Sequence, residues 1–249
     1  MVTDHFGKVA TQYAIHRPSY PAALFDWLAS QCSERTLAWD CGAGSGQASL
    51  ALATYFDHVL ATDMSANQLA QATPHPRIEY RVSLAESSGL ADRSANLVAV
   101  AQALHWFDLE RFYAEVKRVL KPGGMIAAWS YGVIRIDGDE VNALLQDFYH
   151  HVIGPYWPAE RHHVETGYRE LPFPFQRIEP PSLAMEADWT LEHLAGYLRS
   201  WSASAHYAAA KKKDAVSELV GQLQPCWGNP TRTRTVRWPL AMLAGRPVE

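Results

Sequence analysis

Short apolar runs alternate with longer amphipathic segments through the first half of the chain. Most of the runs are continuous enough to be buried on both faces, as the strands of a parallel sheet are. The segments between them repeat their apolar residues at helical spacing. We predict strands over 37–40, 58–62, 78–82, 97–101 and 125–130, and helices over 21–30, 47–55, 67–72 and 109–120. This alternation is typical of an α/β fold with a doubly wound, mostly parallel sheet.

The pattern changes after residue 131. Helices are predicted over 137–152 and 190–201, and strands over 183–189 and 236–244. The stretch 154–181 is rich in proline but carries large aromatic side chains, so we interpret it as an irregular insertion and not as a disordered linker. Arg232, Arg234 and Arg237 favour an edge strand with one face in solvent. We expect one structural domain, with a core over 1–131 and an insertion that also completes the sheet over 132–249.

A glycine-rich turn joins the first predicted strand to a helix, in the sequence L-A-W-D-C-G-A-G-S-G. Gly42, Gly44 and Gly46 let the backbone approach a ligand closely because they have no Cβ, and N–H groups of the helix point into the same space. Asp40 ends the strand, where open α/β sheets bind ligands. The dinucleotide motif G-x-G-x-x-G fails at its third glycine, and the phosphate-binding loop is absent. The turn therefore favours a ligand without a pyrophosphate, with a plain turn as the alternative.

A second acidic residue follows the next predicted strand. Asp63 lies 21 residues beyond Gly42, close to the offset of about 20 residues at which a carboxylate accepts the hydroxyl groups of a ribose. The alternative is a helix cap, because Asp63, Ser65 and Asn67 are all good capping residues. Strand, glycine turn, helix, strand and acid in this order favour a nucleoside ligand.

Several motifs between Leu37 and Tyr131 resemble those of class I methyltransferases that use S-adenosylmethionine: D-C-G-A-G-S-G, A-T-D-M-S, A-E and V-L-K-P-G-G. Two others, Y-A-I-H-R-P-S-Y-P and A-Q-A-L-H-W-F-D, resemble the methyltransferase type 11 branch that contains trans-aconitate methyltransferase. The resemblance implies a Rossmann-like, seven-stranded sheet that ends in an antiparallel hairpin. It also implies a helical and irregular substrate cover, and S-adenosyl-L-methionine as the cofactor.

The resemblance further implies which residues bind the cofactor. They are Asp40, Gly42, Ala43, Gly44, Gly46, Asp63, Met64, Ala85, Glu86 and Gln102, with Tyr13 and Arg17 from an N-terminal lid segment. Arg17 would face the methionine carboxylate, and the alternative is a segment that only docks on the surface. Glu86 is equally suited to capping the turn that follows it.

The candidate catalytic residues are His105 and Trp106, which the resemblance places beside the methyl donor. A packed corner that holds the next helix is the alternative for both. Trp201, His206 and Tyr207 would lie within reach of the pocket by the same resemblance, and core packing explains them nearly as well.

Composition narrows the range of partners. The chain has 249 residues and a net charge of −4, which gives no bulk attraction to nucleic-acid phosphates. Its three cysteines are far apart and odd in number, so neither a disulfide framework nor a zinc site is expected. No apolar run has the length of a membrane span. We expect a soluble, cytoplasmic monomer or homodimer that contacts neither membrane nor nucleic acid.

These features favour transfer of a methyl group to a small molecule, with a carboxylate as one candidate acceptor. The D/N-P-P-Y motif of nucleic-acid amino methylation is absent, and no cluster of metal ligands is visible. In-line transfer depends chiefly on alignment, and a base is needed only if the acceptor must lose a proton. His105 suits the role of base or of clamp.

Two other classes of function are considered. One is an S-adenosylmethionine-binding protein without turnover, whose second half is an interaction surface. The other is a nicotinamide oxidoreductase, because Tyr113 and Lys117 form Y-x-x-x-K. The glycine spacing disfavours it, and an exposed helical pair explains these two residues better.

Overall fold

The computed structural model describes residues 19–248. Within them seven strands lie side by side in the order β3-β2-β1-β4-β5-β9-β6, and two more, β7 (Gln176–Arg177) and β8, also pair with β9. The parallel strands are β1 (Leu37–Cys41), β2 (His58–Asp63), β3 (Ile78–Val82), β4 (Ala95–Ala101) and β5 (Leu120–Tyr131). The long strand β9 (Arg234–Arg246) runs antiparallel to β5. The predicted doubly wound, mostly parallel seven-stranded α/β sheet is thereby confirmed.

The strand order reverses beside β1. Strands β2 and β3 extend from one edge of β1, whereas β4 and β5 extend from the other. The carboxyl ends of β1 and β4 therefore flank the crevice in which open α/β sheets bind ligands. Asp40 lies near the end of β1 and Gln102 directly follows β4, so both are at this crevice.

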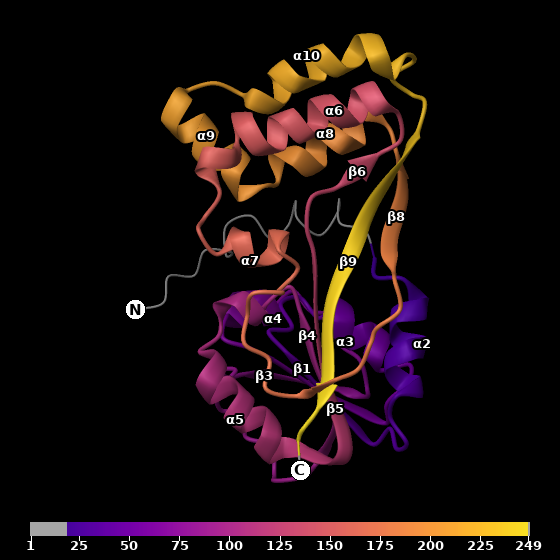
Figure 1. Cartoon of the computed structure of the whole chain (residues 1–249), viewed down its shortest axis with the longest axis vertical. Coiled ribbons are helices and arrows are strands. Elements are labelled where there is room, and N and C mark those ends of the chain that lie inside the picture. Colours follow the sequence, from indigo (N-terminus) through magenta and orange to yellow (C-terminus); the bar gives the residue numbers. More distant parts are fainter. Residues whose placement is uncertain (1–18, 249) are drawn as a thin grey trace.

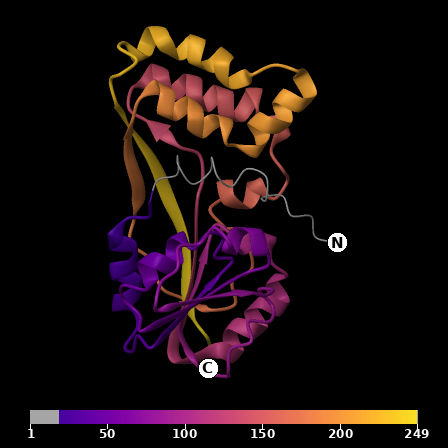
Figure 2. The same cartoon turned by 180° about the vertical axis from the view of Figure 1, so that it is seen from behind.

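Helices cover both faces of the parallel sheet. Helices α2 (Ala22–Ser30) and α3 (Gln47–Leu52) pack on one face, and α5 (Leu109–Val119) packs on the other. The residues of β4 alternate between the two cores, with Leu97 facing α2 and Val98 facing α5. Burial on both sides explains why these strands are continuous apolar runs. Figure 2 shows the same layers from behind.

A second layer of helices stands above the carboxyl ends of the strands (Figure 1). It consists of α6 (Asp139–Asp147), α8 (Leu191–Arg199), α9 (Ser202–Lys211) and α10 (Ala215–Trp227). These helices enclose their own apolar core, which includes Leu145, Leu198, Leu223 and Trp227. The short helix α7 (Arg161–Glu165) lies between this layer and the sheet.

Strand β9 connects the two layers. Its residues 240–245 pair with β5, and its residues 234–239 pair with β8 (Ala184–Trp189) in the expected antiparallel arrangement. Strand β6 (Arg135–Ile136) pairs with the same first half from the opposite side. The prediction of an edge strand around Arg232, Arg234 and Arg237 is therefore wrong. Strand β8 pairs with one side of this half of β9, and β6, which is too short to recognise from its sequence pattern, pairs with the other.

Other element bounds differ in detail from the sequence-based expectations. Strand β5 begins at Leu120 and not at Met125, because Ala95 already pairs with Leu120. The helix expected over 137–152 is α6 followed by a π-helical turn, Phe148–Val152. Helix α4 (Ala66–Leu69) is shorter than expected. Two residues expected at the cofactor, Tyr13 and Arg17, lie outside the described residues.

Candidate functional site

The three glycines of the turn after β1 all have positive φ angles, +72° at Gly42, +56° at Gly44 and +83° at Gly46. A Cβ at Gly42 would lie 2.5 Å from the Cβ of Ala103, and one at Gly46 would lie 2.8 Å from the hydroxyl of Tyr80. A Cβ at Gly44 would have only one described neighbour within 4 Å, the Oε1 atom of Gln68 at 3.9 Å. Gly42 and Gly46 are thus required by packing, whereas Gly44 borders open space.

Asp63 lies at the same opening. Its Oδ2 accepts a 2.8 Å hydrogen bond from the N–H of Gly44, and its Oδ1 accepts one of 2.8 Å from the N–H of Ser65. Ser65 in turn caps α4, with its side chain accepting from the N–H of Gln68. The acid therefore organises the turn before α4 while its carboxylate lies against the bare backbone of Gly44.

Asp40 is fully buried beneath the turn. The hydroxyl of Ser49 donates a 2.5 Å hydrogen bond to its Oδ2, whereas its Oδ1 has no partner among residues 19–248. Burial raises the pKa of Asp40 to about 7, and the nearby charge of Asp63 adds to the rise. An acceptor without a donor in a buried position is costly unless a ligand satisfies it.

The remaining predicted cofactor residues surround this crevice with different contacts. The N–H groups of Gly42 and Ala43 donate to the carbonyl of Thr62, which fixes the turn to β2. Met64 is 50% exposed, and Ala85 is half-buried against the core on the α5 side.

Glu86 and Gln102 make contacts that connect neighbouring elements. The Oε1 atom of Glu86 accepts from the N–H of Asp108, the capping residue of α5, so this contact is with a helix 22 residues further along the chain and not with the turn that follows Glu86. Gln102 has a φ of +57°, and its side-chain amide donates to the carbonyl of Tyr131 at 3.1 Å. This bond ties the end of β4 to the end of β5.

His105 lies in a short 3-10 turn, Leu104–Trp106, just beyond β4. Its Nδ1 is 3.0 Å from the hydroxyl of the buried Tyr168, and its ring lies 4.7 Å from that of Trp106, centroid to centroid. Burial lowers the pKa of His105 to about 4, and the charges of Arg161 and His163 lower it further. The imidazole is therefore neutral near pH 7. Trp106 is 42% exposed, so its side chain lies at the protein surface and not in the core.

Arg161, at the start of α7, stands over two aromatic rings. Its guanidinium carbon lies 4.7 Å from the ring centre of Trp157 and 5.7 Å from that of Tyr149. Its Nε donates to the Tyr149 hydroxyl at 2.8 Å, and that hydroxyl donates to Glu165 at 2.6 Å. Among the described residues Arg161 forms no ion pair with a carboxylate. The stacked guanidinium keeps charge available for another anion.

The sequence did not single out Arg161, His163 or Tyr168 for a functional role. They come from the irregular segment that is more than fifty residues from His105, and no spacing rule connects them. Trp201 packs on Tyr149 and Trp157 at 5.6 and 5.5 Å between ring centres, so it closes the aromatic cluster.

Two other candidates from the second half, His206 and Tyr207, pack against the short helix that contains Tyr156. His206 bonds to the carbonyl of Tyr156 at 3.1 Å, and the ring of Tyr207 packs against that of Tyr156 at 5.2 Å. They support η3 (Gly154–Tyr156), and none of their contacts involves His105.

The Tyr113–Lys117 pair has a structural role. Tyr113 is buried, and its hydroxyl donates to the carbonyl of Pro172 at 2.9 Å. Lys117 lies 5.7 Å from the ring centre of Phe175. Burial raises the pKa of Tyr113 well above its ordinary value, so this hydroxyl is a poor proton donor or acceptor for catalysis.

Residues 19–248 contain no group of three or more histidine, cysteine, aspartate or glutamate side chains that could hold a metal ion. In the same part of the chain, none of the helices combines the length and the apolar composition that crossing a membrane requires.

Comparison with known proteins gives consistent results. The methyltransferase domain family matches residues 39–128. A Dictyostelium discoideum protein named as a methyltransferase is 36% identical over 87% of this chain and 83% of its own length. An uncharacterized methyltransferase of Mycobacterium tuberculosis is 33% identical over 66% of this chain and 70% of its own. A solved structure from Anaeromyxobacter dehalogenans, described as a type II methyltransferase, is 46% identical with a TM-score of 0.89, covering 93% of this chain and 99% of that one.

Proposed function

Because the chain belongs to the methyltransferase family, whose Rossmann-like members use S-adenosylmethionine, we propose that it methylates a small carboxylated molecule bound between His105 and Arg161. The observation that carries this proposal is the guanidinium of Arg161, which is stacked on Trp157 and has no carboxylate partner among the described residues.

The residues at the end of β1 and β2 fit the cofactor. Gly44 leaves room for close approach of the ligand, and the Asp63 carboxylate beside it suits the hydroxyl groups of a ribose. The unpartnered Oδ1 of Asp40 suits a cationic group such as the methionine ammonium. When bound there, the cofactor supplies a methyl group that its sulfonium makes electrophilic.

The acceptor side offers hydrogen-bond donors and positive charge. Arg161 provides the cation, and the indole N–H of Trp157 is buried with no acceptor in the described part of the chain. A carboxylate is ionised near pH 7 and loses no proton when it attacks, so no general base is required. The neutral imidazole of His105, fixed by Tyr168, orients the acceptor. These residues lower the barrier by holding the reacting atoms in line.

The test is transfer of labelled methyl groups from S-adenosylmethionine to a panel of small carboxylic acids and their preformed esters. We expect product from acids alone, and we expect Arg161→Gln to raise the KM of the acid at least about tenfold, because a charge-assisted hydrogen bond contributes roughly 1.5–3 kcal/mol. The affinity for S-adenosylhomocysteine should not change. Arg232→Gln is the matched control, since Arg232 is exposed and lies outside the site.

Three outcomes would contradict the proposal. Methylation of esters as readily as acids would exclude a carboxylate acceptor. An unchanged KM in Arg161→Gln would remove the anchoring role of Arg161. Cofactor binding without any labelled product would support the non-catalytic alternative.

We also propose a cytoplasmic location. All three cysteines are free, and Cys32 and Cys41 are buried. Burial raises the pKa of the Cys32 thiol to about 11, which keeps it protonated and unreactive. Free thiols support a reducing compartment. Whether the enzyme is a monomer or a homodimer stays a prediction.

A further inference from the structure

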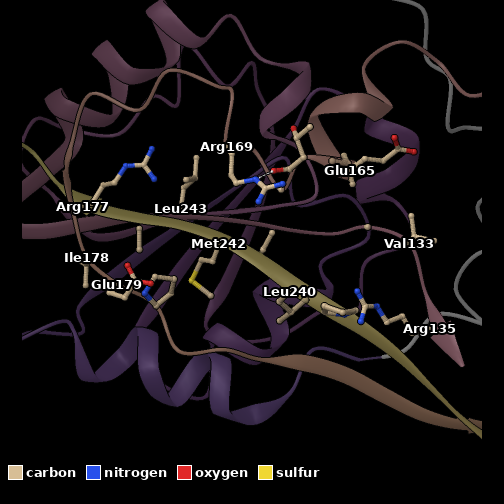
Figure 3. Close-up of a pocket in the computed structure, with 18 residues that line it drawn as sticks. Val133, Arg135, Glu165, Arg169, Arg177, Ile178, Glu179, Leu240, Met242 and Leu243 are labelled. Atoms are coloured by element: carbon tan, nitrogen blue, oxygen red, sulfur yellow. Dashed lines mark hydrogen bonds between the residues drawn. The ribbon is translucent and has the colours of Figure 1, made fainter. Parts of the chain in front are cut away.

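A cavity of about 570 Å³ lies along β9 (Figure 3). Its floor is β9 from Leu240 to Ala244, and its walls are the chain after β5, residues 164–167 with Arg169, and residues 177–180. None of the residues given a role in methyl transfer above lines it.

Three arginines line this cavity, Arg135, Arg169 and Arg177. Figure 3 shows them spread along β9, with Arg177 and Arg135 toward opposite ends. Within the described residues none of the three forms an ion pair, whereas Arg81, Arg118, Arg199 and Arg237 all pair with carboxylates. The cavity therefore gathers three guanidinium groups whose charge no carboxylate among the described residues pairs with.

The contacts of these arginines leave most of their donors available. The Nε of Arg169 donates to the carbonyl of Thr166 at 2.9 Å, and the guanidinium carbon of Arg177 lies 5.5 Å from the ring centre of Phe173. Each contact orients its arginine side chain and leaves the positive charge of the guanidinium group without a carboxylate partner. Two carboxylates also line the cavity, but Glu165 already accepts the hydroxyl of Tyr149. Glu179 is the other, so positive charge is in excess.

The strand register indicates how long a ligand must be to contact the arginines at both ends of the cavity. Arg135 pairs with Arg237 and Arg177 pairs with Gly245, so they lie eight residues of β9 apart, roughly 26 Å between backbones. A compact ion cannot contact both side chains, whereas an elongated one carrying separate anionic groups can.

The floor of the cavity adds a backbone donor. The N–H of Leu240 donates to Leu183, and the carbonyl of Ala244 accepts from Ile178, so these groups face away from β5. Met242 has the same parity along the strand, and its N–H therefore faces the same side. Met242 pairs with Trp129 of β5 on one side of β9. On the side that faces away from β5, the chain leaves β9 between residues 178 and 183, and no strand in the described part pairs with Met242.

The cavity and the candidate acceptor site use opposite sides of one segment. Gly167 faces β9, since a Cβ there would lie 2.7 Å from that of Ala241, and its φ of +61° also favours glycine. The next residue, Tyr168, turns the other way and contacts His105. The cavity is therefore separate from the cofactor crevice.

We propose that this cavity binds an elongated organic polyanion, with carboxylate or phosphate groups held by Arg135, Arg169 and Arg177. Planar guanidinium groups suit both kinds of oxyanion through paired N–H donors.

Calorimetry on the full chain tests this proposal, with oligo-glutamate and linear polyphosphate, each long enough to span the roughly 26 Å between the end arginines, as separate probes in a low-salt chloride buffer. We expect saturable binding of at least one probe, weakened at least about tenfold by the double substitution Arg169→Gln and Arg177→Gln, and by added salt. Arg232→Gln, an exposed and unpaired arginine elsewhere, should bind as the unaltered chain does. The tighter probe identifies the anionic group.

Three results would overturn the proposal. The first is no saturable binding of either probe. The second is equal binding by the double variant and the unaltered chain, when circular dichroism shows that both are folded. The third is displacement of the probe by S-adenosylhomocysteine, which would place the anion in the cofactor crevice. All three concern binding alone, so they do not depend on the identity of the methyl acceptor.

Discussion

Asp40 has the most perturbed environment of the acidic residues at the crevice. It is fully buried, holds one hydrogen bond from Ser49, and has a pKa raised to about 7. A group whose pKa is higher in the folded than in the unfolded state binds more protons when folded, so stability falls as pH rises between the two values. In this protein the window runs from the ordinary value of 3.8 to about 7.

Asp40→Asn should remove the fall in the free energy of unfolding that accompanies rising pH. In the unaltered chain without ligand, the free energy of unfolding should fall between pH 4 and pH 7 by up to about 1.4 kcal/mol per unit relative to the variant, and the difference should be flat above pH 7. Urea unfolding at several pH values measures it. Asp57 is exposed and lies immediately before β2, so Asp57→Asn should show the same dependence of unfolding free energy on pH as the unaltered chain. Parallel slopes in Asp40→Asn and the unaltered chain would contradict the assignment.

The roles of single residues at the turn could be predicted in outline from their order along the chain. Asp40, Gly44 and Asp63 were expected at one crevice, and the structure brings them together. Their separate duties could not be predicted. Only packing distinguishes Gly44, which borders open space, from Gly42 and Gly46, which adjoin Ala103 and Tyr80.

The segment that follows α7 is the element on which His105 depends. Tyr168 is buried and meets the imidazole at 3.0 Å, so its hydroxyl fixes the ring orientation and tautomer. If His105 orients the acceptor as proposed, Tyr168 is a positioning residue that acts on the reacting atoms through His105.

Tyr168→Phe should lower kcat about tenfold, a loss of roughly 1.4 kcal/mol, typical of a single hydrogen bond. It should leave the affinity for S-adenosylhomocysteine unchanged and shift the ¹⁵N resonance of the His105 Nδ1. Tyr113→Phe is the matched control, since Tyr113 is buried and also donates one hydrogen bond, to Pro172. Equal effects of the two substitutions on kcat, or an unmoved His105 resonance, would show that Tyr168 serves packing alone.

Elements differ in how well their sequence predicts them. Strand β4 is buried on both faces, so its apolar run is unambiguous. Helix α7 is five residues long with only Val164 buried, and it has no amphipathic period to detect. Strand β6 has two residues and exists only because β9 offers an edge. Arg161, on the proposed acceptor side, lies in such a short element, which is why its sequence did not single it out.

Across the whole molecule, β9 pairs with β5 in the sheet and with β8 beside the helical cover, so we expect the two layers to unfold as one cooperative unit. Trp238 lies in the half of β9 that enters the cover, is fully buried, and donates to the hydroxyl of Tyr197 at 3.0 Å. Its ring also packs on Trp189 at 4.8 Å between centres. Disturbing this residue therefore affects both layers.

Trp238→Ala should lower the free energy of unfolding by about 3–5 kcal/mol, as for large core aromatics, within one cooperative transition. Circular dichroism and tryptophan fluorescence should report the same midpoint. Trp106→Ala, at a 42% exposed position, should cost far less. Two separate transitions in Trp238→Ala would show that the cover unfolds independently of the sheet.

The central claim is that a nucleoside cofactor binds where Gly44 and Asp63 meet, and calorimetry with S-adenosylhomocysteine tests it most directly. We predict that Asp63→Asn weakens binding at least about tenfold, because a charged acceptor for the ribose hydroxyls is lost. Asp57→Asn, just before the opposite end of β2, should bind as the unaltered chain does. Equal affinity of Asp63→Asn and the unaltered chain, or no binding by the unaltered chain, would contradict the account.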